Sequence, residues 1–496
     1  MSELNSSDEP IFTPRMQAND PNRLNLLRTV LLSLGFLSVL SALTYYNFEV
    51  PLLLFKLIPD DFTWLGIFSQ NTLVGTIMVI DNVLAVMLQP YFGSLSDRTK
   101  SKFGRRMPYI IIGTFVCGLM FTIAPWIQIM PFEWIQILAG LVAILFVFNL
   151  FMAFFRTPSL SLLADYTPDT VRSAGSAIQQ FVSNLGTIIA FLIPTLVAFL
   201  QPLLNLDEIW LDTLGFLIIS VFMFVCLALL YLTIKETPTG TKFFEIADQP
   251  INIHPIKFEI IPPTEEQLVR KESNWANLIG IFKETEKSTL WLLLAVFCWF
   301  TGFGVIEAFF SQFAVEYLFL TKAEAGQVIL VYPISMILSA IPTGIIGQKI
   351  GRKNSLYLGV GGLIILMTII SFIIVPSKNV LLLIIFLGLV GFFWMDVIVN
   401  TFPMVWSLAP EGKVGGYTGV YYTFNQMAAI ISPILMGAVF DIVGVGMGPN
   451  RFIFMFPYVL TFLVVALLLL TQVVRGEVIL TRQQIEEQIL KYEEKD

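Results

Sequence analysis

Three acidic residues lie inside long apolar stretches of this sequence: Asp81, Glu307 and Asp396. A charged side chain at the centre of a membrane-spanning helix costs roughly 2.5–3.5 kcal/mol even on the mildest insertion scale, so each is a functional hypothesis. No lysine or arginine is predicted at the same depth to pair with them. Acids without a fixed base are suited to bind a transported proton or sodium ion, because the cation relieves the cost of burying the charge. The alternatives are a protonated carboxyl that hydrogen-bonds a neighbouring helix and, for Glu307, contact with water near the outer rim.

A second set of residues could bind a polar solute through hydrogen bonds and ring stacking. Asn149, Asn400 and Asn425 are amides at membrane depth, where such groups are uncommon, and we weight Asn400 and Asn425 above the aromatic candidates. The other candidates are Tyr45, Asn47, Trp299, Trp394 and Gln426. Aromatic residues make up 14% of the chain, so a single ring more often packs between helices or faces lipid than binds a ligand. A contact between helices is the alternative role for Asn149.

Composition points to a membrane protein. The chain has 496 residues, of which 56% are hydrophobic and 13% are charged, whereas soluble domains carry about 25% charged residues. The apolar residues come in blocks of about twenty, the length that crosses a bilayer core of roughly 30 Å. The first residues are polar and lack the pattern of a signal peptide, so we expect the first span to direct insertion.

Several classes of function find no support in the sequence. Cys117, Cys226 and Cys298 fall inside apolar blocks, so neither a disulfide framework nor a zinc site is predicted. The single histidine, His254, lies in a polar loop. There is no phosphate-binding glycine loop, nucleophile triad or metal-ligand cluster, so we expect no catalysis, no cofactor and no metal. Nothing indicates a nucleic-acid partner, and a monomer is expected.

The apolar blocks predict an all-α membrane protein with twelve transmembrane helices in two pseudo-symmetric six-helix bundles. The spans are predicted at 28–54, 71–95, 108–130, 134–157, 175–200, 213–234, 289–315, 325–347, 355–375, 379–407, 416–439 and 452–473. Of the 29 lysines and arginines, only Lys56, Lys322, Lys378 and Arg451 fall on the side away from the termini. By the positive-inside rule, both termini are cytoplasmic, and we expect a multi-pass protein of the cell membrane.

Five segments follow from these spans. We predict a cytoplasmic tail at 1–27, a six-helix half at 28–234, a cytoplasmic linker at 235–288, a second half at 289–473 and a cytoplasmic tail at 474–496. Within the linker, residues 274–285 alternate apolar and charged positions at helical spacing, which favours a short helix on the membrane surface.

The most specific local pattern follows the second span. It comprises Gly93, Asp97, Arg98, Gly104, Arg105 and Arg106. The glycines permit a tight turn, and the acid can meet a helix N-terminus or a base. We predict a cytoplasmic gate whose ion pairs form in one conformation and break in the other. Ordinary anchoring by positive charge is the alternative.

The same pattern recurs after the eighth span, at Gly344, Gln348, Lys349, Gly351, Arg352 and Lys353. The second copy is four residues shorter, and Gln348 replaces the acid. Duplicated halves packed around a central cavity are the usual architecture of secondary transporters.

Three further charged residues are predicted to belong to the gate. Arg156 falls at the predicted end of the fourth span, and Asp165 and Arg172 follow it. An arginine there can pair with Asp97 or with helix C-terminal carbonyls. A snorkelling arginine at the membrane interface is the alternative.

The glycine, acid and arginine pattern after the second span resembles the loop-two signature of the major facilitator superfamily. The longer stretches 89–108 and 156–173 resemble the sucrose-carrier branch of the glycoside-pentoside-hexuronide:cation symporters. This resemblance implies cation-driven uptake of a sugar or glycoside. Asn149 stands where members of that branch carry an aspartate held to handle the proton, so coupling would run through another acid, use another ion, or be absent.

The leading hypothesis is therefore a proton- or sodium-coupled sugar symporter that works by alternating access. A facilitator or exporter of another small polar solute is the alternative. A sensor that keeps a transporter scaffold would be expected to carry a large soluble domain, and the polar linker is too short and too rich in proline to form one.

Overall fold

The computed structural model describes residues 25–59, 62–64, 68–99, 101–166, 172–205, 207–237, 240–243, 280–281, 286–409 and 414–475. Within these ranges, twelve helical segments are long and apolar enough to cross a membrane. This confirms the predicted all-helical membrane fold with twelve spans. The tails predicted at 1–27 and 474–496 lie almost entirely outside the described residues, and so does the surface helix predicted at 274–285 except for 280–281.

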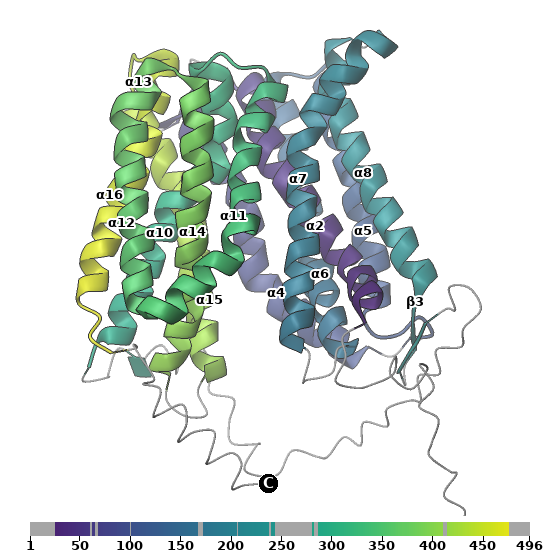
Figure 1. Ribbon diagram of the computed structural model, residues 1–496. Coiled ribbons are helices and arrows are strands. Elements are labelled where there is room, and N and C mark those ends of the chain that lie inside the picture. The colour runs from purple at the N-terminus through teal and green to yellow at the C-terminus, as the bar shows by residue number, and fades with distance from the viewer. Residues whose placement is uncertain are drawn as a thin grey trace, which may run out of the picture.

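The first half contains six spans and two small hairpins (Figure 1). Its elements are α2 (Leu26–Leu57), β1 (Thr63–Trp64), β2 (Phe68–Ser69), α3 (Gln70–Met78), α4 (Ile80–Arg98), α5 (Met107–Ile123), η1 (Ala124–Ile129), α6 (Trp134–Tyr166), α7 (Arg172–Leu204), α8 (Glu208–Thr233), β3 (Ile234–Thr237) and β4 (Gly240–Phe243). The β3–β4 hairpin begins the segment predicted as a polar linker, and Ile234 anchors it because its side chain is buried against the first half.

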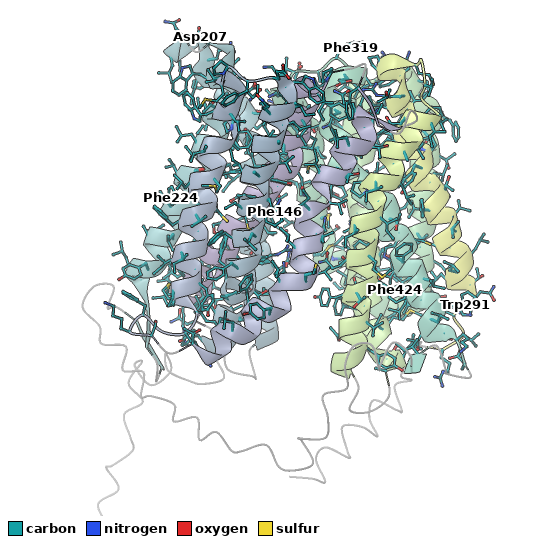
Figure 2. The ribbon with its side chains drawn as sticks, turned by 180° about the vertical axis from the view of Figure 1, so that it is seen from behind. Phe146, Asp207, Phe224, Trp291, Phe319 and Phe424 are labelled. Carbon is teal, nitrogen blue, oxygen red and sulfur yellow. The ribbon has the colours of Figure 1, made fainter. Side chains whose placement is uncertain are left out.

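The second half repeats the arrangement. Its elements are α10 (Ser288–Gln312), η3 (Phe313–Tyr317), α11 (Lys322–Ile350), α12 (Arg352–Ile369), η4 (Ile370–Ile374), α13 (Val375–Ser377), α14 (Val380–Leu408), α15 (Val414–Ile442), η5 (Gly448–Phe454) and α16 (Met455–Thr471). The start of α2 and the end of α16 lie at the same end of the molecule, called the terminal end below (Figure 1). Trp291 and Phe424 lie toward this end, and Asp207 and Phe319 lie at the opposite end (Figure 2).

Aromatic rings fill the core of the first half. The Phe121 ring stacks on Phe148 with centroids 4.6 Å apart and meets the edges of Tyr45 and Phe216. Lipid is as apolar as these side chains, so close packing rather than exclusion from water holds such helices together. The rings thereby join α2, α5, α6 and α8 into one rigid body.

The two halves touch closely at the opposite end, where small residues let helix backbones approach. A Cβ atom on Gly75 of α3 would stand 2.4 Å from the carbonyl oxygen of Pro433 in α15, and one on Gly326 of α11 would stand 2.5 Å from that of Phe191 in α7. Toward the terminal end the two halves diverge (Figure 1). The structure is therefore closed at the opposite end.

The second span is interrupted in its middle. Helix α3 ends at Met78 and α4 begins at Ile80, with Val79 forming the turn between them. Interrupted spans in transporters commonly form binding sites, because the break frees backbone groups and changes the direction of side chains. Asp81 lies in the first turn after this break.

Replacing Gly75 with valine should destabilise the closed contact between the halves. The new side chain would press on the backbone of Pro433, and overpacking of this kind costs about 1–3 kcal/mol. The midpoint of thermal unfolding in detergent should fall below that of the wild type. Gly361→Val is the matched control, because a Cβ atom at Gly361 would meet nothing within 4 Å. Equal midpoints for the two variants would contradict the close contact.

Candidate functional site

A small polar cavity lies inside the first half, among α2, α4 and α6. Its lining comprises Leu43, Asp81, Ala85, Gln89, Asn149, Met152, Ala153 and Arg156. Its volume of about 10 Å³ is the space of about one water molecule. The cavity is thus sized for a water or a bare cation and is too small for a sugar. Together with Tyr46, the side chains of Asp81, Gln89, Asn149 and Arg156 form what we call the central polar cluster.

Asp81 and Gln89 reach the cavity because they lie eight residues apart, about two helical turns, on α4. Asn82 donates its backbone N–H and its side-chain amide to Asp81 Oδ1, at 2.6 and 2.9 Å. These bonds hold the carboxylate at the start of α4, where the helix dipole favours a negative charge. The second oxygen of Asp81 is left to the cavity.

Asn149 and Tyr46 bring α6 and α2 together beside the cavity. Asn149 Nδ2 donates to the hydroxyl of Tyr46 at 3.2 Å, and both side chains are buried. The carbonyl oxygen of Asn149 is buried and has no hydrogen-bond partner. An unpaired buried acceptor is costly, so this oxygen is suited to accept a bond from a bound solute or to ligate a cation.

Arg156 corrects the expectation that no base lies near Asp81. The fourth span was predicted to end at residue 157, but α6 continues through Pro158 to Tyr166. Arg156 therefore lies ten residues, roughly 15 Å, inside the helix. Its guanidinium lines the same cavity as Asp81, and the two opposite charges attract each other. Arg156 belongs to the central polar cluster, and the predicted position at a helix end was wrong.

Glu307 faces the central polar cluster from the second half. Every residue of α10 is described, and Glu307 is the one that is exposed, although α10 packs against α2, α15 and α16. Its side chain is therefore accessible from a space enclosed by the two halves. The negative charge of Glu307 acts on both Asp81 and Tyr332 of α11. Two of the three predicted acids thus lie near enough across the boundary between the halves for their charges to interact.

Asp396, the third predicted acid, lies elsewhere, in the packing of the second half. It is 1% exposed, and its Oδ1 accepts hydrogen bonds from Ser355 of α12 at 2.6 Å and from Asn400 at 3.0 Å. Its other oxygen is buried without a partner. Gly347 and Gly359 make room for this group, since a Cβ atom on either would clash with Asn400 or Asp396. Asp396 and Asn400 meet each other and do not line the cavity of Asp81.

The three aromatic candidates are packed in the core. Tyr45 is enclosed by Phe121 and Phe216, Trp299 is 1% exposed, and Trp394 stacks on Phe303 with centroids 3.7 Å apart. The remaining candidates, Asn47, Asn425 and Gln426, are half-buried.

The two glycines of the loop-two pattern take different conformations: Gly93 lies within α4, and Gly104 lies between α4 and α5. Gly104 has a φ of +97° and its counterpart Gly351 a φ of +88°, a region that favours glycine. Arg106 is buried and donates to Ser96 Oγ at 2.5 Å, while Arg105 is exposed. Gly93 is buried against Thr157 of α6. The side chains of Asp97, Arg98, Asp165 and Arg172 lie outside the described residues, so the predicted gate ion pairs stay a prediction.

The sequence analysis missed the polar groups at the opposite end. Asp441 of α15 accepts the backbone N–H groups of Ser69 at 2.7 Å and Thr72 at 2.9 Å, which caps the first turn of α3 across the two halves. Lys322 of α11 binds Glu49 and Asp212 of the first half. Lys322, Asp212 and Asp441 lie near the ends of their helices, where charge is ordinary, so only their contacts across the halves mark them. Glu49 lies eight residues before the end of α2, and its position inside an apolar block was a signal that the sequence analysis did not use.

Within the described residues, no group of three histidine, cysteine, aspartate or glutamate side chains could hold a metal ion. Twelve spans in two halves, with polar groups where the halves meet, are typical of a membrane transporter.

Residues 34–433 match the sequence profile of the Major Facilitator Superfamily, and the chain belongs to this superfamily. Its members are membrane transporters and not enzymes. No curated protein matches the chain.

Solved structures agree on the fold. The crystal structure of a D-xylose-proton symporter has a TM-score of 0.68 at 14% identity, covering 90% of this chain and 98% of that one. An inward-open structure of the xylose transporter XylE from E. coli has a TM-score of 0.65 at 16% identity, covering 93% and 99%. The nucleoside transporter NupG has a TM-score of 0.62 at 13% identity, covering 90% and 100%. At such identities the likeness concerns the fold alone.

Replacing Asp396 should separate a packing role from a coupling role. Asp396→Ala removes the acceptor of Ser355 and Asn400, and leaving buried groups unsatisfied costs about 1–3 kcal/mol. We expect a clear drop in the thermal unfolding midpoint. Asp396→Asn keeps one acceptor oxygen and removes the charge, so it should unfold near the wild-type temperature. An Asp396→Asn variant as unstable as Asp396→Ala would show that the negative charge itself is needed for packing.

Proposed function

We propose that this protein is a secondary active transporter that couples the movement of a sugar, such as a disaccharide or glycoside, to a proton or sodium ion. The observation that carries the proposal is the placement of Asp81 and Arg156 in one cavity of about 10 Å³, within reach of the charge of Glu307 from the other half. A cavity of this size, lined by an acid and two amides, suits one cation or water and not the sugar itself.

In this proposal Asp81 is the coupling site. A cation entering the cavity would compete with Arg156 for the carboxylate, and the oxygens of Asn149 and Gln89 are placed to complete its ligands. Oxygen ligands suit hard cations, and a proton on Asp81 would relieve the same buried charge. Cation binding at Asp81 then changes the net charge that Glu307 faces across the boundary, which links ion binding to the relative position of the halves.

The sugar would bind in the space between the halves, on the side of Glu307. The exposed carboxylate of Glu307 can accept hydrogen bonds from hydroxyl groups, and Tyr332 and the half-buried Asn425 and Gln426 add donors and acceptors. Gln426 Oε1 is buried without a partner. The resemblance to sugar symporters and the fold shared with a D-xylose-proton symporter support a sugar as the solute.

We further propose that the terminal end faces the cytoplasm, because the terminal side carries nearly all the lysines and arginines. The structure, closed at the opposite end, then represents an inward-open state of an uptake system.

Uptake by the purified chain in proteoliposomes tests the function directly. An inward proton or sodium gradient should drive labelled disaccharide above its equilibrium level, because the gradient supplies the work. Dissipating the gradient with an ionophore should reduce uptake to equilibration. Equilibration alone under both gradients would contradict coupled symport and favour a facilitator.

Asp81→Asn should uncouple transport, since the amide can neither be protonated nor neutralise a cation. We expect loss of gradient-driven accumulation, while exchange of labelled for unlabelled sugar without a gradient stays within about threefold of wild type, a difference of less than 1 kcal/mol. Asp207→Asn, an exposed acid at the start of α8, is the control. Accumulation by Asp81→Asn equal to that of the wild type would remove Asp81 as the coupling site.

A further inference from the structure

The four basic residues on the side away from the termini are all engaged. Lys378 lies over the rings of Tyr317 and Phe319 at 4.5 and 4.6 Å. Arg451 is 3.7 Å from Glu316 and lies over Phe55 of the first half at 6.0 Å. Lys56 and Lys322 both contact Asp212. Bases on this side oppose the positive-inside bias, so their positions call for a structural reason.

Lys322 is the base that joins the two halves most directly. Its ammonium binds Glu49 of α2 and lies 2.8 Å from Asp212 Oδ1 of α8, while the lysine itself begins α11 in the second half. Glu49 is 2% exposed, so its carboxylate depends on this contact. Glu49 Oε1 and Asp212 Oδ1 both contact the Lys322 Nζ atom. Because the two oxygens lie around one position, they could share a single cation there.

The charges of this cluster balance only while Lys322 is present. Glu49 and Asp212 contribute two negative charges, and Lys56 and Lys322 contribute two positive ones. Lys56 lies 3.0 Å from Asp212 Oδ2 and belongs to the first half. When the halves separate at the opposite end, α11 carries Lys322 away and Lys56 stays. One net negative charge then remains on the first half, beside the buried hydroxyl of Tyr45, whose surroundings include both acids.

We propose that Glu49 and Asp212 form a monovalent-cation site at the opposite end, which the Lys322 ammonium fills in the closed state and which one sodium ion or proton fills when that end opens. An unpaired buried carboxylate is expensive, and one monovalent charge restores neutrality. The external cation and Lys322 therefore compete, and the cation favours the open state by binding it selectively. This inference deepens the proposed ion coupling by adding a site separate from Asp81, and it rests on that function for its role in transport.

The test reads the opening of that end through a cysteine at the contact between α7 and α11. Gln327 Nε2 donates to Thr195 Oγ1 there at 3.2 Å and the threonine is half-buried, so Thr195→Cys should react faster with a membrane-impermeant maleimide when the halves part. The full-length chain would carry it with the buried Cys117, Cys226 and Cys298 changed to alanine. Leu203→Cys on the same helix is 64% exposed and controls for reagent access.

With Lys322 intact, the labelling rate at Thr195→Cys should rise with sodium or with acidification, compared with potassium at equal ionic strength. Whichever of these two conditions raises the labelling rate identifies the bound cation as sodium or as a proton. Lys322→Gln removes the competitor, so half-maximal labelling should occur at a cation concentration lower by about fivefold or more, the lower limit of ordinary coupling between sites. Glu49→Gln should raise the rate and make it independent of the cation. Lys378→Gln should behave as the wild type.

The inference would be overturned if the labelling rate of Thr195→Cys changed with neither sodium nor acidification. It would also be overturned if the Glu49→Gln variant kept the wild-type cation dependence. Thermal unfolding and gel filtration confirm that each variant is folded, and the double variant Glu49→Gln with Lys322→Gln provides a charge-balanced form in case a single change fails to fold. It should also show no cation dependence. Labelling is measured without a gradient or sugar, so its outcome is independent of whether Asp81 couples transport.

Discussion

An ionised side chain placed inside a membrane must be matched where it lies, because neither lipid nor close-packed helices can solvate it. In this chain the matching groups come from different helices and, at the opposite end, from different halves. Lys322 of α11 forms ion pairs with Glu49 of α2 and Asp212 of α8. Arg156 of α6 lines the same small cavity as Asp81 of α4. The positions of the helices therefore depend on these charges as much as on the packing of apolar surfaces.

The two ends of the molecule use this constraint differently. At the opposite end, ion pairs and a helix cap by Asp441 act together with glycines that let backbones touch. These contacts are short and specific, so they can be broken together when the halves rotate as rigid bodies. At the terminal end the halves diverge (Figure 1). A transporter alternates between such states when the state closed at one end and the state closed at the other have similar free energies. Polar contacts whose partners can be exchanged keep these two free energies similar.

The interruption of the second span connects the two regions. Its outer piece, α3, is held to α15 through Asp441 and through the close approach of Gly75 to Pro433. Its inner piece, α4, carries Asp81 and Gln89 into the cavity. Val79 between them keeps right-handed helical backbone angles (φ −79°, ψ −16°), so the two pieces follow closely on each other. A movement of α15 against α3 at one end can thus be transmitted to Asp81. The aromatic core around Phe121 keeps the remaining helices of the first half together.

The sequence alone was enough for the twelve spans and the superfamily, because span length, apolar content and the glycine-rich turn at Gly104 are local properties of the chain. It also singled out Asp81 and Glu307, since an acid within an apolar block is costly whatever surrounds it. It could not tell that Asp396 meets Ser355 and Asn400 away from the cavity, because that depends on how α12 packs against α14. The placement of Arg156 beside Asp81 required knowing that α6 runs past Pro158, and the meeting of Lys322 with Glu49 required both halves. Those pairings join residues up to 273 positions apart, so only the tertiary structure, which decides which helix faces are neighbours, could set them.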